Sequence, residues 1–334
     1  MWHGQVRPGG KLELVGIDVV DSTGSSAVFS EGQIAVTNCS FTRCITGTNN
    51  VMRSLEASIT SGGAALRALG GAIQAVGVEA ALLSTGSSFV ACSAQGGKYS
   101  NYGGAVYAFA MTRIDSSRFE ANHVEGGTDS TSGSALFIEA RRLDISTSAF
   151  ISNKARAHFQ AYGGAVRLRD CTASMSLIMD RLPNFCNVAP SDCGVQLRAV
   201  TFVGNAASGG PRTSRIKGGA IYMTTELLCV NLTDSSFVAN SAEDSVGNTE
   251  GGAVQVYNKA VLKIARTTFV GNTAKGATDQ VRCPTLRPHA AGRARVGTVT
   301  TQASPPFEFP VPICKPDASG AEPLISARLE SLKW

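Results

Sequence analysis

The sequence predicts an all-β fold, a right-handed parallel β-helix (solenoid) of about seven coils with an irregular, proline-rich C-terminal tail. Three observations predict it. One glycine motif recurs at regular spacing, a phenylalanine motif recurs between its copies, and apolar and polar residues alternate around both. Since the two motifs keep their order from copy to copy, the chain is interpreted as stacked copies of one unit.

The first motif is Gly-Gly-Ala followed by Val or Ile. Its copies begin at Gly70, Gly103, Gly163, Gly218 and Gly251, with the degenerate copy Gly133-Ser134-Ala135-Leu136 among them. Successive copies lie 33, 30, 30, 55 and 33 residues apart, and an insertion at about 171–193 explains the long step. Glycine permits turns with positive φ and lets stacked backbones approach closely.

The second motif is Phe-x-x-Asn. It begins at Phe119, Phe150, Phe202, Phe237 and Phe269, while the copies at Phe41 and Phe89 end in Cys44 and Cys92. A phenylalanine that fills the bore contributes about 2–3 kcal/mol through burial. The asparagine suits a tight turn and can form a hydrogen-bonded ladder with neighbouring coils. Seven copies predict a rod roughly 30–35 Å long.

Alternation identifies two strands in each unit. The residue after Gly-Gly-Ala and the residue two further on are apolar in every copy, as in Val166 and Leu168. Apolar residues also stand five and seven positions before Phe, as in Ile145 and Leu143. The odd offset to the Phe requires a bend or bulge. Two strands cannot bury an apolar face alone, so like strands pair in parallel between copies, with a right-handed crossover.

Three parts of the chain follow from this repeat. Residues 1–30 are expected to be an N-terminal segment or partial cap, 31–274 the β-helix repeats, and 275–334 a proline-rich tail that is loop-like or disordered. The first residues lack the apolar run of a signal peptide, which suggests an N-terminal truncation. No apolar run reaches the roughly 18 residues of a membrane helix, so no membrane span is expected in this chain.

Composition and short motifs limit the partners, cofactors and modifications that are expected. The net charge is +5 and the Lys and Arg residues are scattered, so nucleic acid is not expected as a partner. The nine cysteines form no CxxC pair, and no metal or cofactor is predicted. Cys171, Cys186 and Cys193 cluster in the insertion, which suits a local disulfide. Asn38 and Asn231 begin sequons and are candidate glycosylation sites if the chain is secreted.

One outward column is a candidate binding ladder. Tyr107, Phe137, Arg167 and Tyr222 occupy the position between the two inward residues after Gly-Gly-Ala. Rings and a guanidinium group in a row could stack on sugar rings or bind a surface protein. The alternatives are ordinary stacking between rungs, or coverage of the column by a loop.

No catalytic residue is predicted. Asp115, Asp144 and Asp234 stand at different offsets from their phenylalanines, so they do not share a column as paired carboxylates would. Arg215-Ile216-Lys217 resembles the Arg-Ile-Lys motif of polygalacturonases, but the other motifs of those enzymes are absent. The two repeated motifs together, over residues 34–274, resemble the polymorphic outer-membrane protein repeat of chlamydial surface adhesins.

That resemblance implies a pectin-lyase-like β-helix, an extracellular or cell-surface location and a role in adhesion. Its bacterial members end in a membrane β-barrel, whereas here the last repeat is followed by a segment of about 60 residues that includes several prolines. The function expected is therefore a secreted or cell-surface module for adhesion, binding or structural roles, without catalysis. The alternatives are a carbohydrate-active enzyme (polysaccharide lyase or glycoside hydrolase) and a non-functional fragment of a larger surface protein. The oligomeric state stays open.

Overall fold

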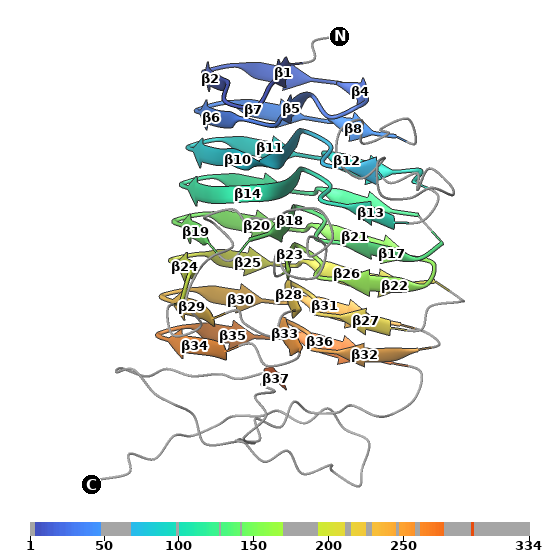
Figure 1. Ribbon diagram of the computed structural model, residues 1–334. Coiled ribbons are helices and arrows are strands. Elements are labelled where there is room, and N and C mark those ends of the chain that lie inside the picture. Colours follow the sequence, from blue (N-terminus) through green and yellow to red (C-terminus); the bar gives the residue numbers. More distant parts are fainter. Residues whose placement is uncertain are drawn as a thin grey trace, which may run out of the picture.

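The chain forms a rod of stacked β-strands, with its N-terminal strands at one end and the last repeats at the other (Figure 1). The computed structural model describes residues 4–47, 68–97, 100–126, 128–140, 142–169, 193–210, 215–224, 229–244, 247–257, 261–276 and 295–296. These residues contain strands and no helix, and strands pair in parallel from coil to coil. The predicted parallel β-helix is confirmed.

The main sheet has 15 strands and combines the two strands that the repeat predicts. After the glycine motif come β10 (Ile73–Thr85), β14 (Val106–Asp115), β18 (Leu136–Glu139), β23 (Val166–Arg169), β28 (Ile221–Thr224) and β33 (Val254–Tyr257), and β1 (Gly4–Val6) and β5 (Val28–Ser30) are their counterparts in the first two coils. Before the Phe come β2 (Lys11–Val15), β6 (Gln33–Thr37), β19 (Leu143–Ser146), β24 (Val195–Arg198), β29 (Cys229–Thr233) and β34 (Val261–Ala265). β10 and β14 span both halves, and β37 (Arg295–Val296) pairs antiparallel with β33.

Each phenylalanine of the Phe-x-x-Asn or Phe-x-x-Cys motif lies at the centre of a three-residue strand. This phenylalanine sheet comprises β3 (Asp18–Val20), β7 (Ser40–Thr42), β11 (Ser88–Val90), β15 (Arg118–Glu120), β20 (Ala149–Ile151), β25 (Thr201–Val203), β30 (Ser236–Val238) and β35 (Thr268–Val270). Its eight strands define eight coils, because one coil precedes the first phenylalanine and carries Val19 in its place. Residues 4–30, expected as a segment or cap, supply β1 to β5 of this end.

Two further sheets extend the coils beyond the two predicted strands: the third sheet has a strand in all eight coils, and the fourth sheet has six strands. The third sheet holds β4 (Thr23–Gly24), β8 (Ile45–Thr46), β12 (Ser93–Gln95), β16 (His123–Glu125), β21 (Lys154–Ala157), β26 (Ala206–Gly209), β31 (Ser241–Glu243) and β36 (Thr273–Lys275). The fourth holds β9 (Ala68–Leu69), β13 (Ser100–Tyr102), β17 (Ser130–Ser132), β22 (Gln160–Tyr162), β27 (Arg215–Lys217) and β32 (Asn248–Glu250). The segments expected as variable loops are thus largely strands.

The bore is filled by the inward columns. Seven phenylalanine rings stack along it, with neighbouring centroids 4.6–5.1 Å apart and ring planes within 8° of parallel. Val166, Leu168 and their counterparts pack around the rings, and all are buried. Burial of these apolar columns is the main force that holds the coils together.

Left-handed residues make the bends that the odd offset predicts. The residue three before Phe and the residue two after it both adopt positive φ, as in Thr147 (50°) and Ser152 (53°) around Phe150. Each such residue bends the chain and shifts the alternation of inward and outward side chains by one residue. The short strand between the two bends can therefore direct its central side chain, the Phe, into the bore. This conformation costs a non-glycine residue about 1 kcal/mol or more.

Polar ladders flank the phenylalanine strands. In the column three after Phe, each asparagine amide nitrogen donates to the next asparagine's Oδ1, at 2.8–3.0 Å from Asn122 to Asn272. The same nitrogen donates to the Phe carbonyl of the preceding coil, as Asn205 does to Phe150. Two residues before Phe, hydroxyls accept from the backbone of the adjacent coil, as Ser148 does from Ser117. The asparagine ladder was predicted, whereas the hydroxyl ladder was not.

Candidate functional site

The candidate binding ladder is aligned as predicted but is not exposed. Tyr107, Phe137, Arg167 and Tyr222 are in register on neighbouring strands of the main sheet. The three aromatic side chains are buried, with Phe137 fully so, and Arg167 is half-buried. The prediction of an accessible surface is therefore wrong. The fourth sheet packs over this column. The main-sheet strands that follow the glycine motif therefore have both faces largely buried.

Tyrosines of the fourth sheet cover the column. The ring of Tyr102 stacks on Phe137 with centroids 4.5 Å apart, and Tyr162 stacks on Tyr222 at 4.8 Å. The Arg167 guanidinium lies 4.8 Å from the Tyr162 ring centroid and 5.3 Å from that of Phe137. Arg167 also donates to Ser132 Oγ at 2.5 Å. Aromatic stacking and cation–π contacts here join two sheets of the same rod and do not present a ligand site.

Alkaline titration tests this burial. Desolvation raises the pKa of Tyr162 and Tyr222 above the ordinary value of about 10. Between the unfolded and folded pKa values the folded chain holds more protons, so the free energy of unfolding falls as the pH rises above about 10. Ultraviolet absorbance of phenolate should show these tyrosines ionising late, and Y162F with Y222F should remove that late step. Ionisation of all six tyrosines in one ordinary step would contradict it.

The disulfide differs from the predicted local cluster. Cys193 pairs with Cys229, which is 36 residues away in sequence. Cys171 and Cys186 lie outside the described residues. The stacking of coils explains this pairing, because β24 and β29 are paired neighbours and the starts of these two strands lie together. Cys39, Cys44 and Cys92 are free and buried.

Both candidate glycosylation sites lie on the outside of the rod. Asn38 is exposed at the positive-φ bend between β6 and β7. Asn231 is half-buried at the centre of β29, between Gln196 and Lys263 of the neighbouring strands. Neither side chain points into the bore, so the outward position expected for both sequons is kept.

The acidic side chains considered for catalysis are paired with other groups. Asp234 accepts two hydrogen bonds from Arg266, at 2.6 and 2.8 Å, and this contact lowers the pKa of its carboxyl group. Asp115 accepts from Ser146 at 2.6 Å, and Asp144 lies 3.9 Å from Arg113. These pairs join neighbouring coils on the surface, where an ion pair contributes about 1 kcal/mol or less.

The Arg-Ile-Lys segment is β27 of the fourth sheet. Ile216 is fully buried, and Lys217 is largely buried, with its Nζ 3.5 Å from Glu250 and 4.7 Å from the Tyr257 ring centroid. Burial lowers the pKa of His123 on β16. In the described part of the chain, no three His, Cys, Asp or Glu side chains gather closely enough to hold a metal ion.

The outer face of the phenylalanine sheet is the broad exposed surface that sequence reasoning missed. Its outward residues stand directly before and after each Phe, in two rows that run along the rod. The first row is Asp18, Ser40, Ser88, Arg118, Ala149, Thr201, Ser236 and Thr268. The second row is Val20, Thr42, Val90, Glu120, Ile151, Val203, Val238 and Val270. All are partly or fully exposed.

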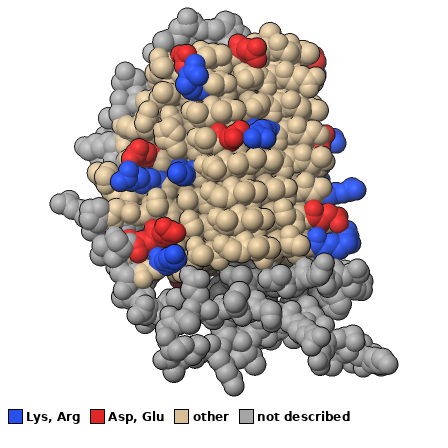
Figure 2. Space-filling view, turned by 180° about the vertical axis from the view of Figure 1, so that it is seen from behind, with Lys and Arg blue, Asp and Glu red and all other residues tan. Residues whose placement is uncertain are grey.

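This face carries little charge. Its charged members are Asp18 and the Arg118–Glu120 pair, whose Nη2 and Oε2 atoms lie 2.8 Å apart. Figure 2 shows the broad, largely uncharged face from behind, with most charged side chains near its margins. Hydroxyls and methyls repeat about every 4.8 Å along the rod. The tripeptide Ser/Thr-Phe-Val, which recurs at Phe89, Phe202, Phe237 and Phe269, is the sequence signal that could have identified it.

Comparison with known proteins does not assign this surface. No protein-family model matches the chain, and neither a curated protein nor a solved structure matches it significantly. Among the described residues, no helix is long and apolar enough to cross a membrane.

Proposed function

We propose that the chain is a secreted or cell-surface β-helix module that acts in adhesion, binding or a structural role and does not catalyse a reaction. The observation that carries the proposal is the exposed face of the phenylalanine sheet. Eight short strands present two straight rows of small hydroxyl and aliphatic side chains there. A flat, regular and weakly charged surface suits an extended partner that itself repeats, and a polysaccharide or a repetitive surface protein has that character.

Further features support an extracellular location. A disulfide such as Cys193–Cys229 persists in oxidising compartments and is rare in the cytosol. The sequons at Asn38 and Asn231 are on the outer surface. The resemblance of the two repeated motifs to polymorphic outer-membrane protein repeats agrees with this location and with adhesion.

Binding to an array of plant, algal and microbial polysaccharides tests the proposed face. We expect the chain to bind a subset of them, and V238K with V270K to weaken binding by about tenfold or more, because two lysines interrupt a row of the contact surface. L83K with M111K is the matched control. Leu83 and Met111 are exposed apolar residues on β10 and β14 of the main sheet. Binding to no polysaccharide would contradict a polysaccharide partner, and equal losses in both double variants would contradict the assignment of binding to this face.

A further inference from the structure

In the seven coils that carry the phenylalanine, the column three residues after it contains two cysteines and five asparagines. Cys44 and Cys92 occupy the second and third coils, directly before Asn122. Their strands are in register, since Phe41 pairs with Phe89 and Ile45 pairs with Ser93. Both side chains are fully buried. The two thiols therefore stack on adjacent rungs with no residue between them.

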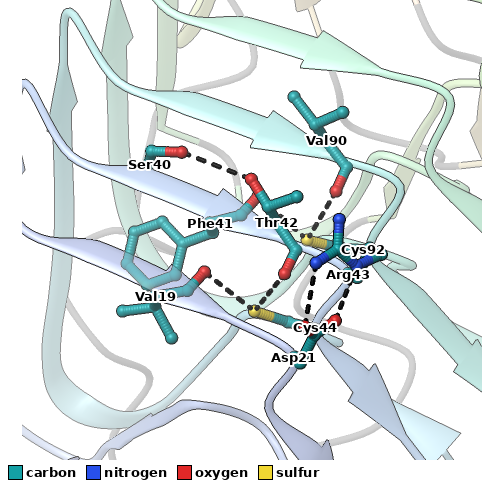
Figure 3. Close-up of polar contacts among 9 residues, drawn as sticks. All are labelled: Val19, Asp21, Ser40, Phe41, Thr42, Arg43, Cys44, Val90 and Cys92. Carbon is teal, nitrogen blue, oxygen red and sulfur yellow. Dashed lines mark hydrogen bonds and ion pairs between the residues drawn. The ribbon is translucent and has the colours of Figure 1, made fainter.

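The sulfur atoms take over part of the asparagine hydrogen bonding. Cys92 Sγ lies 3.4 Å from the Phe41 carbonyl, which is the contact that an asparagine amide makes in later coils. Cys44 Sγ lies 3.9 Å from the carbonyls of Val19 and Thr42 (Figure 3). The Cys92 backbone N–H donates to Asn122 Oδ1 at 2.9 Å, so the ladder continues into the cysteine pair. Sulfur forms weaker hydrogen bonds than an amide, so these two rungs are held together less strongly.

The spacing of the two strands permits a disulfide bond between Cys44 and Cys92, at the position where later coils have an amide–amide hydrogen bond. Neighbouring strands lie about 4.8 Å apart, within the roughly 4.4–6.8 Å between Cα atoms that a disulfide spans. Cys39 provides an internal comparison. It is also buried, but it belongs to the hydroxyl ladder, where the adjacent rung carries Ser87. Only Cys44 and Cys92, among the described free cysteines, have a thiol in the same column on the next coil.

We propose that Cys44 and Cys92 form a peroxide-sensitive redox site, in which oxidation joins the second and third coils by a disulfide. The Cys44 thiolate attacks one oxygen of hydrogen peroxide, the O–O bond breaks, and Cys44 becomes a sulfenic acid with release of hydroxide. The Cys92 sulfur then attacks the Cys44 sulfur and displaces the sulfenic oxygen as water. The two thiols lose two electrons and two protons, and the peroxide becomes two water molecules.

The environment assigns different roles to the two thiols. A hydrogen bond with Cys92 lowers the pKa of Cys44, while burial raises the pKa of Cys92. Cys44 is therefore the thiol that ionises first and attacks the oxidant. It also lies next to Arg43, whose exposed guanidinium donates to Asp21 at 2.6 and 2.8 Å. The Val19–Asp21 segment of the first coil covers Cys44 on this side, where Cys44 Sγ contacts the Val19 carbonyl (Figure 3).

The test uses the full chain, reduced and then treated with hydrogen peroxide. We expect peptide mapping to find Cys44 joined to Cys92 with loss of two hydrogens, and dithiothreitol to reverse it. The cross-link closes a loop of 48 residues, so the melting temperature should rise by roughly 5–10 °C. C39S should keep both responses, whereas C44S should lose both.

A second variant keeps the test decisive if C44S does not fold. C92N places an asparagine next to Asn122 and extends the amide ladder, so it should fold and show neither the cross-link nor the temperature shift. Detection of the Cys44–Cys92 peptide together with a reversible shift supports the proposal. Irreversible oxidation of either thiol, cross-linking only after unfolding, or the same temperature shift in C92N would overturn it.

Discussion

Replacement of Asn205 by alanine should lower the free energy of unfolding by about 3–9 kcal/mol. Asn205 donates to the Phe150 carbonyl and accepts from both the backbone N–H and the side-chain amide of Asn153. Alanine leaves these three buried groups without their partner, and each unsatisfied group costs about 1–3 kcal/mol. Urea unfolding of the purified chain, followed by circular dichroism, measures the change.

Asn205→Cys is the matched control for that variant. Cys92 occupies the same column, and its sulfur contacts the Phe41 carbonyl as an amide would. We expect the cysteine variant to lose less than half as much stability as the alanine variant. A loss below about 1 kcal/mol for alanine would mean that the ladder contributes little beyond ordinary exposed hydrogen bonds.

Gly163→Ala should destabilise the chain by at least about 3 kcal/mol or prevent folding. Gly163 has φ of +68°, and a Cβ there would lie 2.2 Å from the Val166 carbonyl oxygen of its own turn. The backbone must move to relieve that overlap, and the glycine turn in every neighbouring coil is stacked against it. The first glycine of the motif is therefore required for both conformation and space.

Gly204→Ala separates conformation from space. Gly204 has a similar φ of +61°, but a Cβ there would meet nothing closer than Ser152 Oγ at 3.6 Å. Ala121 and Ala239 adopt the same conformation at the equivalent position of other coils. We therefore expect a cost of about 1 kcal/mol, measured by the same urea unfolding. Equal losses for the two glycine variants would show that steric overlap in the glycine turn destabilises the chain less than its backbone conformation does.

The two repeated motifs predicted the strands that lie directly beside them in the sequence. The strands of the main sheet begin at Ile73, Val106, Leu136, Val166, Ile221 and Val254, as the glycine motif requires. The third and fourth sheets escaped prediction for a physical reason. Their strands are often only two or three residues long, and their small cores use residues such as Ala161 and Ala207. Such segments resemble loops because too few residues alternate to show a period.

The burial of the candidate binding ladder could not be predicted from the alternation within one strand. Alternation placed Tyr107 and Tyr222 on the face away from the bore, and that assignment of face is right, since both pack outside the bore cluster. Alternation cannot show whether another part of the chain covers that face, and here Tyr102 and Tyr162 do so. The exposed face lies instead around each Phe, where no segment among the described residues covers the two outward rows.

Distances between paired nitroxide side chains test the stacked β-helix most directly. Thr42, Val203 and Val270 share one outward row of the phenylalanine sheet, on β7, β25 and β35. With one coil every 4.8 Å, double electron–electron resonance should give about 19 Å for residues 42 and 203 and about 29 Å for 42 and 270. Two distances in that proportion, at the spacing of parallel strands, are the result expected of one continuous rod. Equal distances, or a 42–270 distance well beyond about 40 Å, would contradict in-register stacking of the coils.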